Sequence, residues 1–130
     1  MTTKPLVLIV EDDLDLQQRA AFTVEPHAEV LVAGSVEKAR AILYEHGNIG
    51  YVILDGFVPE QEGIALNGSE TTHELAVYIR KHLPNALIYT ASSDDKINEE
   101  LEKLGCVRST KYGAAKAVVA KILDRAIKAA

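Results

Sequence analysis

The chain has 130 residues, of which 48% are hydrophobic and 25% are charged, and its formal net charge is −5. This size and composition predict one soluble domain with its own hydrophobic core. The negative charge and the lack of a basic cluster exclude nucleic acid as the main ligand, because phosphate binding needs a basic surface.

Short apolar runs alternate with longer amphipathic segments along the whole chain. The runs are rich in Val, Ile and Leu and predict strands buried on both faces. In chain order they are about 5–10, 29–33, 51–54, 86–90 and 106–109. The amphipathic segments predict helices over about 13–24, from Ser35 to Gly47, over about 69–82, from Asp94 to Gly105, and over about 113–128. Five strand–helix units in a row predict a parallel sheet with helices on both faces.

Several chemically useful residues lie where the predicted strands end. Glu11 and Asp12 follow the first strand, and Asp55 follows the third. Thr90 ends the fourth strand, and Lys111 lies just past the fifth. Ligands of parallel sheets bind outside the carboxyl ends of the strands. We therefore expect these five residues to meet at one edge of the sheet.

The three acids of this group predict a magnesium site. Clustered carboxylates repel one another unless a cation binds or a proton is shared. Glu11, Asp12 and Asp55 offer only oxygen ligands, which suit Mg²⁺, and a backbone carbonyl near Phe57 could be another ligand. Asp55 could then attack a phosphoryl group to form an acyl phosphate, with Lys111 placing a positive charge on the phosphoryl oxygens.

Two residues at the end of the fourth predicted strand suit the same chemistry. The Thr90 hydroxyl and the Ala91 amide could donate hydrogen bonds to phosphoryl oxygens. The small side chain of Ala91 leaves room for the group.

Each of these residues also has an ordinary structural explanation. Acids such as Asp13 are favoured at helix N-termini, and Asp55 with Gly56 could form a simple turn. Lys111 alone would be a surface lysine, and Thr90 alone would suit any strand. Their expected convergence at one edge favours the functional interpretation.

Five short motifs, taken together and in order, resemble the receiver domains of two-component response regulators. They are Leu8-Ile9-Val10-Glu11-Asp12-Asp13, Ile53-Leu54-Asp55, Pro59 with Gly63, Tyr89-Thr90-Ala91-Ser92, and Lys111. The resemblance covers essentially the whole chain. It implies an α/β, flavodoxin-like, doubly wound fold with three layers, five helices and a five-stranded parallel sheet in the order 2-1-3-4-5.

The resemblance also implies roles for the site residues. Asp55 would accept a phosphoryl group from a sensor histidine kinase or a histidine phosphotransfer protein, and Glu11 and Asp12 would hold Mg²⁺. Thr90 would be the switch hydroxyl, and Lys111 would sense the phosphate. The chemistry would be self-catalysed phosphotransfer and autodephosphorylation at Asp55 rather than conventional turnover. The signal would then pass to an unknown downstream protein, and a homodimer is possible.

The sequence departs from the receiver pattern in the switch region. Tyr112 follows Lys111, where receivers usually have proline. Arg108 stands at the position where receivers commonly carry Tyr or Phe, and Tyr112 could supply the aromatic ring instead. Arg108 itself could form a salt bridge on this protein. The turn that begins at Gly105 is about one residue short.

A second departure lies between Gly63 and the third predicted helix. This segment is about five residues longer than usual, and Asn67-Gly68-Ser69 is predicted as extra loop.

Two other functions fit parts of the pattern. A degenerate receiver could act as a docking module that does not depend on phosphorylation. A phosphate-ester hydrolase with an Asp nucleophile would need a second acid two residues later, where Phe57 cannot transfer protons.

We expect residues 1–130 to form a single receiver domain without an output domain. The single cysteine, Cys106, cannot form an internal disulfide and is predicted to be buried. No apolar stretch is long enough to span a membrane, and the N-terminus does not look like a signal peptide. The expected location is the cytoplasm.

Overall fold

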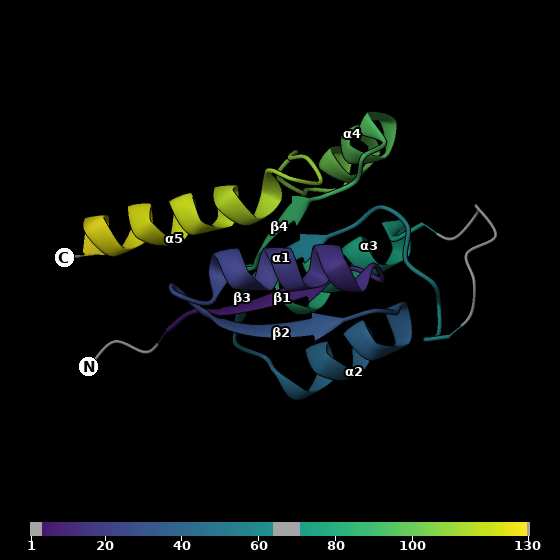
Figure 1. Ribbon diagram of the computed structural model, residues 1–130, viewed down its shortest axis with the longest axis horizontal. Helices are drawn as coiled ribbons and strands as arrows, with labels where there is room; N and C mark the ends of the chain where they lie inside the picture. The colour runs from purple at the N-terminus through teal and green to yellow at the C-terminus, as the bar shows by residue number, and fades with distance from the viewer. Residues whose placement is uncertain (1–3, 64–70, 130) are drawn as a thin grey trace.

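The computed structural model describes residues 4–63 and 71–129. Its strands are β1 (Leu6–Val10), β2 (Glu29–Ala33), β3 (Ile49–Leu54) and β4 (Leu87–Thr90). Its helices are α1 (Leu14–Val24), α2 (Val36–Glu45), α3 (His73–His82), α4 (Asp95–Lys103) and α5 (Ala114–Ala129). The strands form one parallel sheet in the order β2-β1-β3-β4 (Figure 1). The parallel α/β fold is therefore as predicted.

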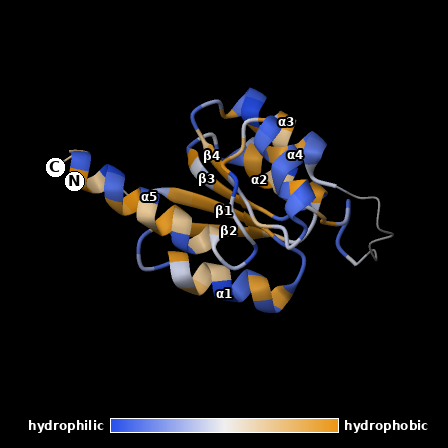
Figure 2. Ribbon diagram, turned by 90° about the horizontal axis from the view of Figure 1, so that it is seen from above, coloured by the Kyte–Doolittle hydropathy of each residue, from blue (hydrophilic) through white to orange (hydrophobic). Residues whose placement is uncertain are grey.

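Helices cover both faces of the sheet because its central strands are apolar on both sides. In β1, Leu6, Leu8 and Val10 belong to one core cluster, and Val7 and Ile9 belong to the other. The first cluster lies under α2, α3 and α4, and the second under α1 and α5 (Figure 2). Successive strand residues point to opposite faces, so one apolar run supplies both cores.

The prediction of two buried faces is wrong for one strand. β2 lies at the edge of the sheet, and its residues from Glu29 to Val32 are exposed or only half-buried. Among the described residues, β2 has a neighbouring strand, β1, on one side only.

The prediction of a fifth strand at 106–109 is also wrong. In the part of the chain that the structure describes, this segment forms one isolated bridge, between Tyr89 and Val107. Beyond Val107, the Thr90 hydroxyl donates to the Ser109 carbonyl at 3.1 Å and accepts from the Ser109 amide at 2.7 Å. The Thr90 side chain thus satisfies the backbone amide and carbonyl of Ser109, which strand pairing would otherwise satisfy. The backbone pairing with β4 therefore ends at Val107.

Side-chain caps fix the starts of three helices. Asp13, Ser35 and Asp94 each accept a backbone amide of the first turn, at α1, α2 and α4 respectively. Asp13 is the N-cap of α1, which agrees with its interpretation as an acid at a helix N-terminus. Helix α3 begins at His73, four residues later than predicted. The predicted extra loop, Asn67-Gly68-Ser69, lies outside the described residues.

The two atypical residues of the switch region have different surroundings. Arg108 forms ion pairs with Asp95 at 2.7 Å and with Glu102 at 3.7 Å, which confirms the salt-bridge prediction. Tyr112 is exposed. Cys106 is buried, as predicted, and burial raises the pKa of its thiol to about 11. Among the described residues, no helix is both long enough and apolar enough to cross a bilayer.

Candidate functional site

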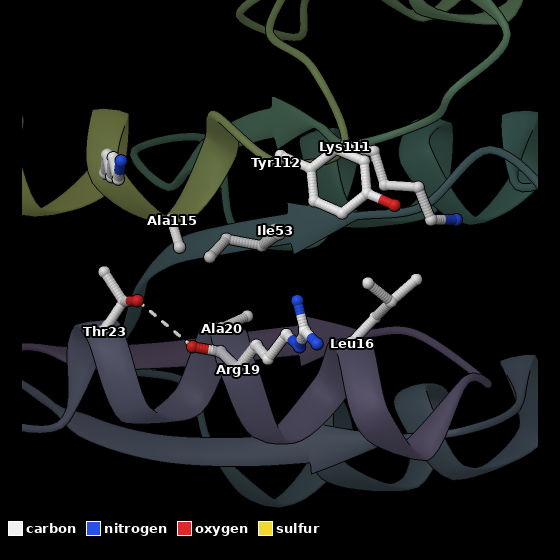
Figure 3. A pocket seen from close by; sticks show the side chains of 9 residues that line it. Leu16, Arg19, Ala20, Thr23, Ile53, Lys111, Tyr112 and Ala115 are labelled. Carbon is white, nitrogen blue, oxygen red and sulfur yellow. Dashed lines mark hydrogen bonds between the residues drawn. The ribbon is translucent and has the colours of Figure 1, made fainter.

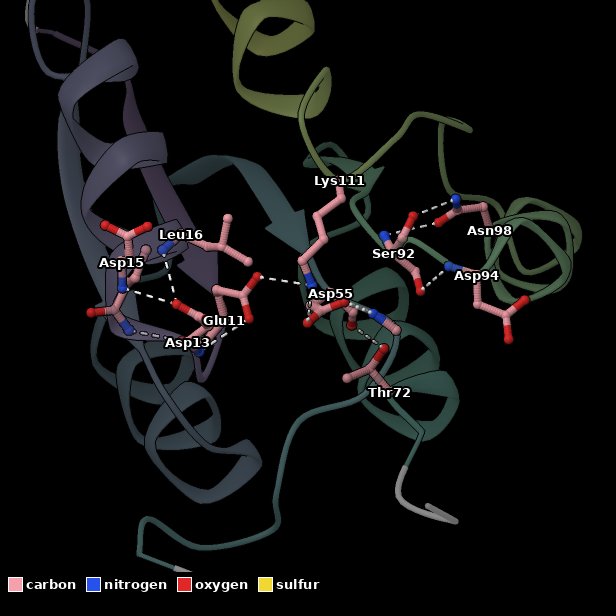
Figure 4. Close-up of polar contacts among 12 residues, drawn as sticks. Glu11, Asp13, Asp15, Leu16, Asp55, Thr72, Ser92, Asp94, Asn98 and Lys111 are labelled. Atoms are coloured by element: carbon pink, nitrogen blue, oxygen red, sulfur yellow. Dashed lines mark hydrogen bonds and ion pairs between the residues drawn. The ribbon is translucent and has the colours of Figure 1, made fainter. Parts of the chain in front are cut away.

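The predicted site residues lie together at the carboxyl ends of the central strands. Val10 and Leu54 are partners in the register of β1 and β3, so Glu11 and Asp55 leave the sheet side by side. Both side chains are buried. Lys111 reaches them from the segment before α5 (Figure 4).

The charges at this edge are unbalanced. Carboxylate oxygens of Glu11, Asp12 and Asp55 all lie within 4.8 Å of one another. The Lys111 ammonium is 3.6 Å from Glu11 Oε1 and 3.5 Å from Asp55 Oδ2. If all three carboxyls are ionised, the Lys111 ammonium leaves two negative charges, which a divalent cation would neutralise.

Burial changes the acidity of the two inner carboxyls. Burial and the adjacent Asp55 raise the pKa of Glu11 to about 8, although hydrogen bonding from the Asp13 amide and the charge of Lys111 act in the opposite direction. Burial also raises the pKa of Asp55, against the effects of Glu11 and Lys111. Two close buried carboxyls relieve their repulsion by sharing a proton, so this pair holds a proton to a higher pH than an exposed carboxyl would.

The donor set fits Mg²⁺. It consists of carboxylate oxygens, and the described residues place no thiol or imidazole in the cluster. Asp12 is exposed, which leaves room for the waters that Mg²⁺ usually keeps. Phe57, the predicted source of a carbonyl ligand, is half-buried and packs its side chain against the core.

Asp55 is held by its own backbone neighbours. Its amide donates to the Val10 carbonyl at 3.1 Å, and its Oδ1 accepts from the Gly56 amide at 2.7 Å. A Cβ at Gly56 would lie 2.5 Å from Ile97 Cγ2 and 2.9 Å from Ser92 Oγ. Only glycine fits this position, so the residue after Asp55 packs tightly against the start of α4.

Two predicted donors are engaged elsewhere. Thr90 is buried beside Leu54 in the sheet, and its hydroxyl is bonded to Ser109. The Ala91 amide donates to the Leu54 carbonyl at 2.9 Å. In this structure the Ala91 amide thus continues the hydrogen bonding of the sheet, and its predicted role as a donor to phosphoryl oxygens stays a prediction. The small side chain of Ala91 is buried in the core cluster under α1 and α5.

A pocket lies between α1 and the start of α5, next to Lys111. Leu16, Ala20, Ile53, Tyr112 and Ala115 line it together with the stems of basic residues (Figure 3). Lys111 contributes to this pocket while its ammonium reaches the carboxylates.

The sequence interpretation missed Thr72. This residue is fully buried, and its hydroxyl donates to the Asp55 carbonyl at 2.7 Å (Figure 4). It is 17 positions away in the sequence. Threonine before a helix ordinarily indicates a cap, so no sequence signal distinguished it.

The sequence interpretation also missed the pairing of Ser92 with Asn98. Their side chains are buried, and the Asn98 amide group bonds to both the backbone N–H and the carbonyl of Ser92. This pair fixes the loop between β4 and α4.

Comparisons with known proteins find structural likeness at low sequence identity. No protein-family model matches the sequence, and no curated protein matches it. A CheY-like receiver domain protein from Methanospirillum hungatei is 16% identical, with a TM-score of 0.75 over 95% of this chain and 94% of that one. A receiver domain protein from Clostridium thermocellum is 20% identical, with a TM-score of 0.74 over 92% of each chain.

A third neighbour was solved in an activated form. The BeF3-activated DrrB receiver domain, from a Thermotoga maritima protein, is 16% identical, with a TM-score of 0.72 over 94% of this chain and 99% of that one. These likenesses cover nearly the whole of the described chain. The protein therefore has the fold of response regulator receiver domains, with four strands in the described sheet where five were predicted.

Proposed function

We propose that this chain is a single phosphoacceptor receiver domain, in which Asp55 takes a phosphoryl group from a phosphohistidine of a kinase or a phosphotransfer protein. One observation carries the proposal: the buried Asp55 carboxylate lies 3.5 Å from the Lys111 ammonium, within a cluster of three acids. A structural ion pair would not need Glu11 and Asp12 beside it.

The proposed step is a phosphoryl transfer between two side chains. A carboxylate oxygen of Asp55 attacks the phosphorus, the P–N bond to the donor imidazole breaks, and the imidazole nitrogen keeps the electron pair. Lys111 offsets the charge of the phosphoryl oxygens. Glu11, Asp12 and Asp55 would hold Mg²⁺, which would supply the remaining positive charge.

The contacts of Thr90 suggest how the signal leaves the site. The phosphoryl group adds charge and acceptor oxygens beside Asp55. If the Thr90 hydroxyl turns toward it, both hydrogen bonds with Ser109 break. The neighbouring Arg108 is tied to α4 through Asp95. Phosphorylation would thus loosen the segment between β4 and α5 and change the surface offered to a downstream protein.

Beryllofluoride with Mg²⁺ tests the proposal directly, since one structural neighbour was solved in its BeF3-activated form. We expect the amide NMR signals of residues around Asp55 and Ser109 in the wild type to shift. Asp55→Asn should not respond, because it lacks the carboxylate oxygen that would bind beryllium. Asp124→Asn, an acid paired with Lys128 on α5, is the matched control and should respond as the wild type does. An unchanged wild-type spectrum at saturating reagent would contradict the proposal.

A phosphorylation-independent docking module is the second candidate. The observation that favours it is the double hydrogen bond of Thr90 with Ser109, together with the Arg108 ion pairs, which already hold the switch region in one state. In that case a partner would bind Asp55→Asn and the wild type equally well.

A further inference from the structure

Thr72 holds the backbone on both sides of the peptide that links Asp55 to Gly56. Its hydroxyl donates to the Asp55 carbonyl at 2.7 Å, and its amide donates to the Gly56 carbonyl at 3.0 Å. Both atoms belong to one fully buried residue at the start of α3. Two successive carbonyls of the acceptor loop therefore depend on one side chain and its own amide.

The Thr72 hydroxyl bonds to Asp55 instead of capping its own helix. Thr72 occupies the N-cap position of α3, yet its side chain makes no capping hydrogen bond. The other described N-caps, Asp13, Ser35 and Asp94, all bond the first turn of their own helix. A capping bond is typically favourable, so a threonine that forgoes it for Asp55 serves the loop rather than the helix.

The peptide between Asp55 and Gly56 is buried and tightly packed, so its position depends on the hydrogen bonds that it makes. Asp55 and Gly56 are buried, so a carbonyl that lost its donor would go without water. Gly56 already packs against Ile97 and Ser92 on the side of α4. The Gly56 amide holds Asp55 Oδ1 at 2.7 Å. A shift of this peptide would therefore move the Asp55 carboxylate itself.

We propose that Thr72 is a positioning residue for Asp55: its hydroxyl and amide fix the peptide after Asp55 so that the carboxylate is aimed at the incoming phosphorus. This inference rests on the proposed function of Asp55 as acceptor. Aligned attack depends on geometry at the ångström level, so loss of the hydroxyl should lower the rate of transfer more than the binding of the donor.

The test is phosphorylation by acetyl phosphate with Mg²⁺, in which an Asp55 oxygen attacks phosphorus, the P–O bond to the acetyl group breaks, and acetate leaves. Thr72→Val removes the hydroxyl and keeps the branched shape. We expect its maximal rate to fall by about tenfold or more, with the half-saturating acetyl phosphate concentration changed less than about twofold. Thr72→Ser keeps a hydroxyl and should recover most of the rate. Thr71→Val changes the exposed neighbouring threonine and should behave as the wild type.

The outcomes separate this inference from the proposed function. If the wild type is phosphorylated and Thr72→Val reacts equally fast, Thr72 does not position Asp55, and the proposed function stands. A Thr72→Ser rate as low as that of Thr72→Val would also overturn the inference, because the hydroxyl would then not be the cause. If the wild type takes up no phosphoryl group, both fail together. Should Thr72→Val not fold, Thr72→Ala removes the same hydroxyl without adding bulk and carries the same expectations.

Discussion

At the residue scale, the central feature is a buried pair of carboxyls with one lysine. Burial alone would protonate both groups, and the Lys111 ammonium alone would ionise both. The structure lies between these limits: the pKa of both carboxyls is raised, most clearly that of Glu11. A divalent cation that bound here would displace the shared proton, because it would favour the ionised form of both carboxyls.

This arrangement predicts a pH dependence of stability. A carboxyl whose pKa is higher in the folded than in the unfolded chain stabilises the fold at low pH and loses this effect as the pH rises. For Glu11 the loss should occur between its ordinary value of 4.5 and about 8. In metal-free buffer, urea unfolding should show the wild type losing stability relative to Glu11→Gln over this range. Saturating Mg²⁺ should reduce the loss, because the cation replaces the proton.

A wild type and a Glu11→Gln variant with parallel pH profiles would show that Glu11 carries no shared proton. The control is Glu37→Gln, an exposed acid in the first turn of α2, which should follow the wild type at every pH.

At the element scale, the missing fifth strand matters most. The segment after α4 joins the sheet through one bridge at Val107, and the Thr90 side chain then binds Ser109. Beyond the two backbone hydrogen bonds at Val107, the connection between β4 and the approach to Lys111 is held by a hydroxyl that a phosphoryl group could attract. One hydroxyl can change its hydrogen-bond partner by itself, whereas separating two paired strands breaks several backbone hydrogen bonds together.

Substitution of Thr90 by valine should therefore loosen this segment. Valine keeps the shape and removes both hydrogen bonds, so the Ser109 amide loses its acceptor. We expect faster hydrogen exchange at Ser109 and a loss of about 1–3 kcal/mol of unfolding free energy. Thr90→Ser should keep the slow exchange. Slow exchange in the valine variant would mean that other contacts hold the segment, and the proposed route of the signal would be lost.

The same segment shows what a sequence can and cannot predict. The run of Cys106 and Val107 is apolar and follows a helix, so a strand was a reasonable prediction. Whether a neighbouring backbone or a side chain satisfies the groups beyond Val107 depends on where Thr90 points, which no periodicity reports. The caps at Asp13, Ser35 and Asp94 were easier, because the residue type and the helix that follows are adjacent in the sequence.

At the scale of the whole molecule, the topology of the parallel sheet determines where the site lies. Parallel strands bring their carboxyl ends to one edge, so Glu11 and Asp55 meet there, and Lys111 reaches them from the segment before α5 although it is far away in the chain. The meeting of the two acids could be predicted from two apolar runs and the acids that end them. The role of Thr72 could not, because it depends on where the chain returns to start α3. The hydroxyl meets the Asp55 carbonyl only in three dimensions.

The most direct test of this account is to locate the phosphoryl group after phosphotransfer. The chain would be incubated with Mg²⁺ and a phosphorylated histidine kinase or phosphotransfer protein from its source organism, and then mapped by peptide mass spectrometry. The account predicts one labile phosphoryl group on the peptide that contains Asp55, absent in Asp55→Asn and absent when a chelator removes Mg²⁺. Transfer to a different residue, or no transfer from any of these donors, would contradict it.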